Sequence, residues 1–175
     1  MIHMETMDFK IGMGTDVHGF APGRDLILGG VKIDHDRGLA GHSDADVLIH
    51  AVCDAILGAA GLGDIGDLFP DTDPKYKDID SRILLQTCGQ KLARAGYRII
   101  NLDCTVFAQV PKLGSKKQEI AASLAETLAI YPKCVNVKAT TFEHLGFIGR
   151  KEGIAAQAVV LIADRIKTNH QGNMT

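Results

Sequence analysis

The apolar run IAAQAVVLIA at residues 154–163 constrains the fold of this chain more than any other stretch. It is well short of the roughly 20 residues that a membrane-spanning helix needs, and its valines and isoleucines favour a β-strand. A strand that is apolar at nearly every position is typically buried on both faces. Because a domain of 175 residues is small, the cover for the second face could come from another subunit.

Further strands are predicted near the start of the chain. The alternation in KIGMGTDVHGF predicts a strand that places Gly12, Gly14, Asp16, His18 and Phe20 on one face. The following LILGGVKI predicts a hairpin around its glycine pair.

The rest of the chain alternates between helical and strand patterns. Helices are predicted at 81–95 and 115–130, and strands at 97–108 and 134–141. Because strands adjoin one another at the start and near the end, this is not a plain alternation of strand and helix. The predicted fold class is an α/β sandwich of the α+β type, in which a mixed β-sheet carries helices on one face and further subunits on the other.

One more helix is predicted to begin at Ser43 or Asp44, either of which can cap it, and to continue through VLIHAVCDAILGAA. Asp46, His50 and Asp54 are spaced four residues apart and form one polar stripe. Apolar residues occupy the opposite arc, so the helix is expected to pack by one face and to present His50 on the other.

Composition indicates one domain at residues 9–167, with unstructured tails at 1–8 and 168–175. The net charge of −2 gives no broad basic surface, so neither nucleic acid nor an anionic membrane is expected as a partner. The four cysteines are far apart and form no CxxC motif, which is typical of reduced thiols. We therefore expect a cytoplasmic protein whose partners are small ligands or proteins.

Three side chains suggest a metal site. Asp16 and His18 point the same way from the first strand, and His50 lies on the helical stripe. Two imidazoles and a carboxylate are a common catalytic zinc set that leaves one position open, and Asp46 could orient an imidazole behind it. The alternative interpretation is a polar strand face beside a solvated helix face.

The familiar phosphate-binding motifs are missing, since the chain has no GxxxxGK[ST] and its GMG runs on as strand instead of opening a helix. Two glycine-rich segments, at 61–74 and 142–153, are predicted to be long loops, and such loops are usually functional. If this chain handles phosphates, metal ions and backbone N–H groups must neutralise them.

Several motifs together resemble the 2-C-methyl-D-erythritol 2,4-cyclodiphosphate synthases: DVHGF, HSDAD followed by His50, GDIGDLFPDTDP, AQVPKL and VKATTFEHLGFIGRKEGIAA. They occur in order through nearly the whole chain. The resemblance implies a lyase of isoprene (terpenoid) biosynthesis, in the methylerythritol phosphate pathway. It also implies a homotrimer with active sites between subunits.

The resemblance assigns metal and catalytic roles to six residues. Zinc would be bound by Asp16, His18 and His50, and a second ion, Mg²⁺ or Mn²⁺, by Glu143. His42 and Thr141 would stabilise the transition state. The implied reaction is attack of the 2-phosphate of 4-diphosphocytidyl-2-C-methyl-D-erythritol 2-phosphate on its β-phosphorus, with release of CMP.

The resemblance also implies which residues contact the substrate. Those of the first subunit are Asp16, Val17, His18, His42, Ser43, Asp64, Ile65, Gly66, Phe69, Pro70, Asp71, Thr72 and Asp73. Those from the neighbouring subunit, around the cytosine and diphosphate, are Ala108, Gln109, Val110, Pro111, Lys112, Leu113, Gly114, Thr140, Thr141, Phe142, Glu143, Phe147 and Arg150.

Two positions depart from that family, which more often has Gly at Ala45 and Lys at His144. Ala45 is expected in the first helical turn, where its methyl group favours the helix. His144 puts in doubt any contact that depends on the lysine charge. Two other functions remain open: a zinc-dependent phosphohydrolase, and a trimeric cytidine-nucleotide-binding protein without turnover.

Overall fold

A computed structural model describes residues 8–165, so the predicted tails lie almost entirely outside the described residues. The strands are β1 (Phe9–Ala21), β2 (Leu26–Leu28), β3 (Val31–Ile33), β4 (Gly38–Leu39), β5 (Tyr97–Phe107), β6 (Val135–Thr140) and β7 (Gly153–Asp164). The helices are α1 (Val47–Ala60), α2 (Ile65–Leu68), α3 (Ser81–Arg94), α4 (Lys117–Thr127) and α5 (Gly146–Gly149), with the 3-10 turns η1 (Pro74–Tyr76) and η2 (Pro132–Cys134).

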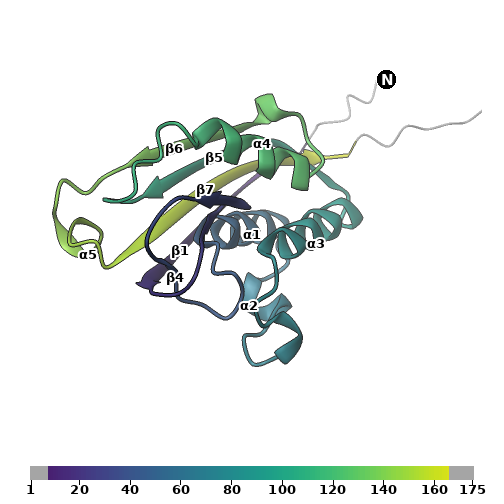
Figure 1. The fold of residues 1–175 in the computed structure, drawn as a ribbon. Helices are drawn as coiled ribbons and strands as arrows, with labels where there is room; N and C mark the ends of the chain where they lie inside the picture. Colours follow the sequence, from purple (N-terminus) through teal and green to yellow (C-terminus); the bar gives the residue numbers. More distant parts are fainter. Residues whose placement is uncertain (1–7, 166–175) are drawn as a thin grey trace, which may run out of the picture.

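Five strands form one mixed sheet in the order β4-β1-β7-β5-β6, and β2 and β3 form the predicted hairpin. Only β5 and β6 run parallel; the other pairs are antiparallel. Helices α1 and α3 lie along one side of the sheet (Figure 1). The mixed α/β sheet with helices on one face is therefore confirmed. Within residues 8–165, no helix combines the length and hydropathy needed to cross a bilayer.

Glycines bring α1 into direct contact with β1. A Cβ atom at Gly12 would lie 2.0 Å from the carbonyl oxygen of Ala55, and one at Gly14 would lie 2.1 Å from that of Ala51. Only residues without a side chain permit this approach. The start of α1 is thus held against the strand that carries Asp16 and His18.

The prediction that α1 packs by a single face is wrong. Ten of its residues are buried, including Val47, Ile49 and Ile56 outside the predicted apolar arc. The helix contacts β1 and β7 on one side and α3 and the hairpin strand β2 on others, so water reaches it only along a narrow strip. His50, on that strip, is half-buried rather than presented to solvent.

Other predicted elements agree with the structure to within a few residues. Helices α3 and α4 and strands β5 and β6 lie where they were expected. The pairing of β5 with β7 is irregular between Ile99 and Asn101, so Ile100 is only half-buried. The two predicted loops are not structureless, because the first contains α2 and ends at the start of η1, and the second contains α5.

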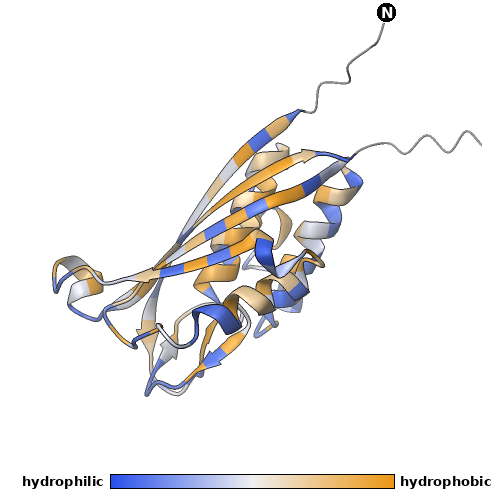
Figure 2. Cartoon of the chain, turned by 90° about the horizontal axis from the view of Figure 1, so that it is seen from above, coloured by the Kyte–Doolittle hydropathy of each residue, from blue (hydrophilic) through white to orange (hydrophobic). Residues whose placement is uncertain are grey.

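The two faces of the sheet differ in burial. Along β7, every second residue from Ile154 to Ile162 is buried against the helices, whereas Val159 on the other face is 40% exposed. Seen from above, apolar and polar residues alternate along parts of the strands (Figure 2). In the single chain, the predicted burial of β7 on both faces is therefore realised on one face only. The exposed large apolar side chains of the outer face are Phe9, Ile11, Met13, Val17 and Val159.

Candidate active site

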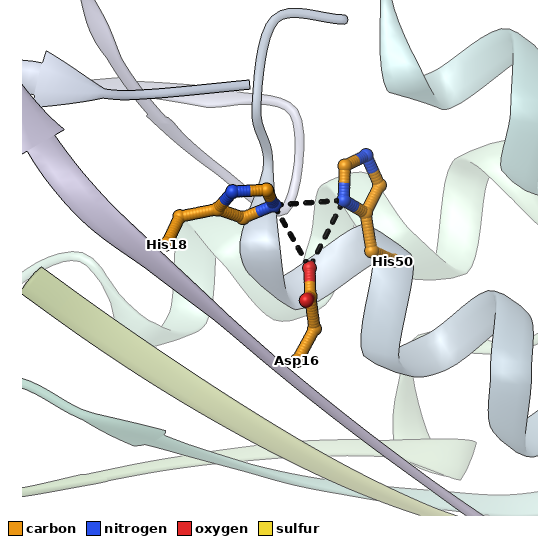
Figure 3. Close-up of side chains that lie close together, drawn as sticks. All are labelled: Asp16, His18 and His50. Atoms are coloured by element: carbon orange, nitrogen blue, oxygen red, sulfur yellow. Dashed lines mark hydrogen bonds and ion pairs between the residues drawn. The ribbon is translucent and has the colours of Figure 1, made fainter. Parts of the chain in front are cut away.

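Asp16, His18 and His50 converge at the start of α1 (Figure 3). The Oδ2 atom of Asp16 lies 2.9 Å from Nε2 of His18 and 3.0 Å from Nδ1 of His50. The two imidazole nitrogens are 3.1 Å apart. The prediction that Asp16 and His18 point to the same side is confirmed, and His50 approaches them from the helix.

The spacing of these three atoms fits a zinc ion. In a tetrahedron with metal–ligand bonds of about 2.0–2.1 Å, neighbouring ligand atoms lie about 3.3 Å apart. The triangle of Asp16, His18 and His50 has edges of 2.9–3.1 Å, close to one face of that tetrahedron. Among residues 8–165, this is the cluster of three or more His, Cys, Asp or Glu side chains that could hold a metal. The fourth position would face solvent or a ligand.

The electrostatics of the triad favour an ionised carboxylate. Burial raises the pKa of the Asp16 carboxyl, but hydrogen bonds with His18 and His50 outweigh burial and hold that pKa well below its ordinary value. Burial lowers the pKa of His18, but the hydrogen bond and the charge of Asp16, with a smaller contribution from the backbone of Ala40, together raise that pKa above its ordinary value. The carboxylate is thus charged and ready to bind a cation.

Asp46, and not Ser43 or Asp44, caps α1, so the predicted start of the helix is wrong. Its carboxylate accepts hydrogen bonds from the backbone N–H groups of Leu48 and Ile49 and of Gly29 and Gly30 in the hairpin. All four bonds come from backbone N–H groups, so the carboxylate is engaged by the backbone instead of by an imidazole. Asp46 therefore ties the hairpin to α1 and positions His50 through the helix.

Ala45 does not lie in the first helical turn, as the sequence had suggested. It precedes the N-cap Asp46 and has φ of 60°, in the left-handed region. Glycine adopts that region without steric cost, whereas alanine does not. This explains why a glycine is common there in the family that the motifs resemble.

A cavity of about 530 Å³ lies beside the triad. Its lining residues are His18, Gly41, His42, Ser43, His50, Ile65, Gly66, Phe69, Pro70, Asp71, Tyr76 and Leu84. The cavity thus unites two triad imidazoles with the segments around 42 and 66–71 that were predicted to contact substrate. Asp73 reaches the same neighbourhood, because its carbonyl oxygen lies 3.4 Å from Nε2 of His42.

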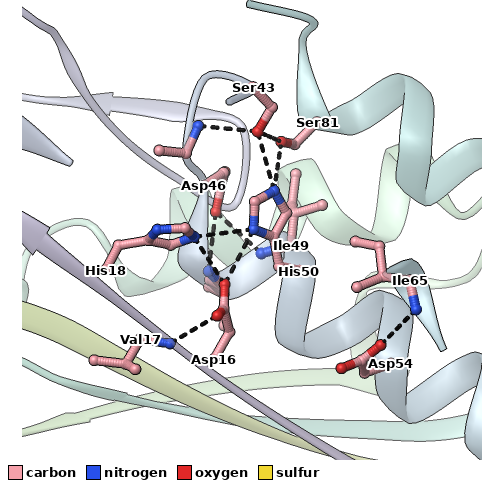
Figure 4. A network of polar contacts seen from close by, with 12 residues as sticks. Asp16, Val17, His18, Ser43, Asp46, Ile49, His50, Asp54, Ile65 and Ser81 are labelled. Carbon is pink, nitrogen blue, oxygen red and sulfur yellow. Dashed lines mark hydrogen bonds and ion pairs between the residues drawn. The ribbon is translucent and has the colours of Figure 1, made fainter. Parts of the chain in front are cut away.

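Asp64 and Asp54 hold the start of α2, which forms one wall of the cavity. The Asp64 carboxylate caps α2 by accepting from the N–H of Asp67, and Asp54 on α1 accepts from the N–H of Ile65 at 2.8 Å. Burial raises the pKa of Asp54, although the bond from Ile65 lowers it. Asp54, on the predicted polar stripe, therefore serves to join α2 to α1 (Figure 4).

The remaining predicted site residues lie together elsewhere, where β5 and β6 end. The N–H of Ala108 donates to the carbonyl oxygen of Thr140 at 3.0 Å, and the N–H of His144 donates to Oε1 of Gln109 at 3.3 Å. The Thr141 hydroxyl donates to Oε1 of Glu143 at 2.6 Å. We call residues 108–114 and 140–150 the outer group, and the triad with its cavity the inner group.

Within the outer group, Thr140 lies far from the triad of its own chain. Thr140 pairs with Phe107, Phe107 with Ala155, and Ala155 with Val17 beside the triad. Three strand spacings of about 4.8 Å separate Thr140 from Val17 by roughly 14 Å. A single metal ion therefore cannot contact both Thr140 and the triad within one chain.

Sequence reasoning missed Ser81 and Asp44. The Oγ atom of Ser81 lies 3.2 Å from Nε2 of His50, and it donates to Oδ1 of Asp44 at 2.5 Å. Ser81 opens α3, so its only sequence signal was that of a helix start. The approach of α3 to α1, which brings it to His50, is a tertiary contact that no local pattern records.

The fold and site together define an enzyme with a metal-binding triad at the rim of a small-molecule cavity. The YgbB family model matches residues 9–163. Over 160 residues the chain is 55% identical to the 2-C-methyl-D-erythritol 2,4-cyclodiphosphate synthase of Nitrosospira multiformis, covering 91% of this chain and 90% of that protein.

Solved structures agree. The bifunctional IspDF of Campylobacter jejuni matches with a TM-score of 0.89 and 49% identity over 91% of this chain, which spans 43% of that longer chain. IspF of Plasmodium falciparum, solved as a CDP complex, matches with a TM-score of 0.79 and 36% identity, over 90% of this chain and 97% of that one. The chain therefore belongs to the YgbB family, that of the 2-C-methyl-D-erythritol 2,4-cyclodiphosphate synthases, and the resemblance seen in its motifs is confirmed.

Proposed function

We propose that this chain is a metal-dependent, cyclising phosphorus–oxygen lyase of the methylerythritol phosphate route to isoprenoids. It converts 4-diphosphocytidyl-2-C-methyl-D-erythritol 2-phosphate into 2-C-methyl-D-erythritol 2,4-cyclodiphosphate and CMP. The observation that carries the proposal is the triad of Asp16, His18 and His50, whose two imidazoles line a cavity of about 530 Å³. Family membership supplies the substrate and the reaction.

In the reaction, an oxygen of the 2-phosphate attacks the β-phosphorus, and the bond to the α-phosphate oxygen of CMP breaks. Zinc on the triad supplies charge stabilisation for the phosphate when it is bound. The protein's task is to fold the substrate back on itself and to hold both phosphates in line. Ser43 and His42 line the cavity next to the triad, where they can contact those phosphates.

The outer group of residues completes the site from a neighbouring subunit of a homotrimer. There, 108–114 surround the cytosine, and 140–143 contact the diphosphate. Glu143 would hold a second ion, Mg²⁺ or Mn²⁺, which would supply charge stabilisation at the diphosphate. Two observations support this arrangement: Thr140 of the outer group lies three strand spacings from its own triad, and the outer face of β1 exposes apolar side chains such as Ile11 (72%) and Met13 (62%). Glu143 is also exposed and free to meet another chain.

The nucleotide, the domain and the location belong to the same proposal. A cytidine diphosphate ligand is supported by the CDP complex of the Plasmodium relative. One domain over residues 9–167 is supported by a single connected core of buried side chains. A cytoplasmic location is supported by four cysteines that are all free.

The decisive experiment is incubation with the cytidyl substrate, with and without a metal chelator, followed by product analysis. We expect CMP and the cyclic diphosphate in equal amounts, and neither with the chelator. A linear phosphate product would instead indicate a phosphohydrolase, because hydrolysis adds water and cyclisation does not. Binding of CDP without any turnover would contradict both.

Sedimentation tests the assembly. We expect a trimer at micromolar concentration, since a heterologous interface that closes a ring gives each subunit the same inner and outer contacts. A fully active monomer would contradict the shared site.

A further inference from the structure

The two ring nitrogens of His50 face different surroundings (Figure 4). Nδ1 points to Asp16 and His18, at the position proposed for zinc. Nε2 points the other way, toward two hydroxyl oxygens: Ser43 Oγ at 3.1 Å and Ser81 Oγ at 3.2 Å. A neutral imidazole carries one proton, and only the nitrogen without it can bind a metal. The contacts at Nε2 therefore affect whether Nδ1 has a free lone pair with which to bind a metal.

The hydroxyl proton of Ser81 is already donated to another hydrogen bond. Its Oγ donates to Oδ1 of Asp44 at 2.5 Å, while Oδ2 of the same carboxylate accepts the backbone N–H of Ser81 at 3.1 Å. An ionised carboxylate only accepts hydrogen bonds. Ser81 Oγ is then left with lone pairs alone to offer His50. The contact at 3.2 Å is favourable only if His50 Nε2 carries the proton.

We propose that Ser81 and Asp44 are positioning residues that hold His50 as its Nε2–H tautomer and leave the Nδ1 lone pair for the metal. Metal-binding histidines commonly donate their other N–H to such a partner, which fixes the ring and raises its basicity. Ser81 is fully buried, so water does not compete for the bond. The inference rests on the proposed function only in taking the triad as a metal site.

Ser43 has a different part in the same contact. Its Oγ accepts the N–H of Ala45 at 3.1 Å, but no carboxylate fixes its own proton. It also lines the cavity beside the triad, whereas Ser81 does not. Ser43 can therefore donate to a bound phosphate while Ser81 holds the tautomer, and the two hydroxyls are not interchangeable.

The first test reads the tautomer directly. Protein labelled with ¹⁵N at histidine and loaded with zinc is examined by long-range proton–nitrogen NMR. We expect His50 to show a protonated Nε2 and a metal-bound Nδ1. A protonated Nδ1, or zinc on Nε2, would overturn the proposal.

The second test measures zinc affinity by competition with a chromophoric chelator. We expect Ser81→Ala to weaken zinc binding roughly 10-fold, and Ser81→Cys to weaken it similarly, because a thiol keeps the size of the side chain but accepts poorly. Ser123→Ala is the matched control: it removes a hydroxyl from the half-buried face of another helix and should stay within about twofold of the wild type.

The outcomes separate this inference from the proposed function. Unchanged affinity in Ser81→Ala, or full rescue by Ser81→Cys, shows that Ser81 only fills space and overturns the inference. Weakened affinity in a chain whose unsubstituted form turns over no cytidyl substrate supports the inference while refuting the proposed function.

Discussion

The inner and outer groups of residues are built in opposite ways. In the inner group, a long strand and a buried helix hold Asp16, His18 and His50, whose side chains are 28%, 18% and 15% exposed. In the outer group, Glu143 follows the end of β6, has φ of 48° and is exposed, with Thr141 as its bonded partner. The first arrangement is rigid before any ligand binds, and the second is a surface feature.

This difference indicates which metal ion each group would hold. A preformed set of three converging ligands suits zinc, which such sites bind tightly and retain. A single exposed carboxylate suits Mg²⁺, which keeps several waters and is held jointly by protein and substrate phosphates. We therefore expect zinc to need only the inner group, and turnover to need both.

The largest effect is expected for His50→Ala. Two protein ligands rarely retain zinc, so the content should fall from one ion per chain to nearly none. Loss of several kcal/mol of charge stabilisation should lower turnover on the order of 10³-fold or more. Metal analysis and steady-state kinetics measure both effects. Full zinc occupancy in this variant would break the assignment of the inner group.

Glu143→Gln sharpens the comparison from the other side. The amide keeps the shape of the side chain and removes its charge, so zinc content and folding should be normal. Turnover should fall on the order of 10²-fold, in kcat more than in KM, if the second ion acts mainly on the departing CMP. Near-normal kcat would show that the outer group carries no metal.

A smaller effect is expected at Asp64, which caps α2 next to the cavity of the inner group and lies outside the triad. Its carboxylate is proposed to hold ribose hydroxyls, so Asp64→Ala should weaken CDP binding roughly 10-fold with zinc unchanged. The control is Asp64→Ser, which retains a capping oxygen but is too short for the ribose. Calorimetry should find it as weak as Asp64→Ala; wild-type affinity in Asp64→Ser would mean that only the cap matters.

The smallest effect concerns Ala45. In a helical turn, Ala→Gly costs about 1 kcal/mol of unfolding free energy. Ala45 lies outside the helix and has φ of 60°, so its replacement by glycine relieves left-handed strain. This gain offsets the loss of a buried methyl group. Denaturation of Ala45→Gly should give a free energy of unfolding within about 0.5 kcal/mol of the wild type. A loss near 1 kcal/mol would instead indicate that Ala45 behaves as an ordinary helical residue.

The parts of the site that follow local periodicity could be predicted from the sequence. The period of two in β1 puts Asp16 and His18 on one face. His50 was placed on the correct helix, and motif order supplied the outer group. These predictions needed only neighbouring residues or the family's pattern.

What could not be predicted depends on contacts between distant segments. Asp46 accepts hydrogen bonds from Gly29 and Gly30, which lie 17 and 16 residues earlier in the chain. Local sequence does not record those bonds, so Ser43 and Asp44 were predicted as the helix cap in its place. Ser81 meets His50 across 31 residues. Tertiary packing, not local propensity, decided each of these.

The central claim is that each active site combines the inner group of one chain with the outer group of another. Mixed assemblies of His50→Ala and Glu143→Gln, each inactive alone, test it most directly, with mixing verified by mass spectrometry. In a ring formed from equal amounts, about a quarter of the sites pair an intact triad with an intact Glu143. The account predicts recovery of roughly a quarter of wild-type turnover. Activity no greater than that of the separate variants would contradict it.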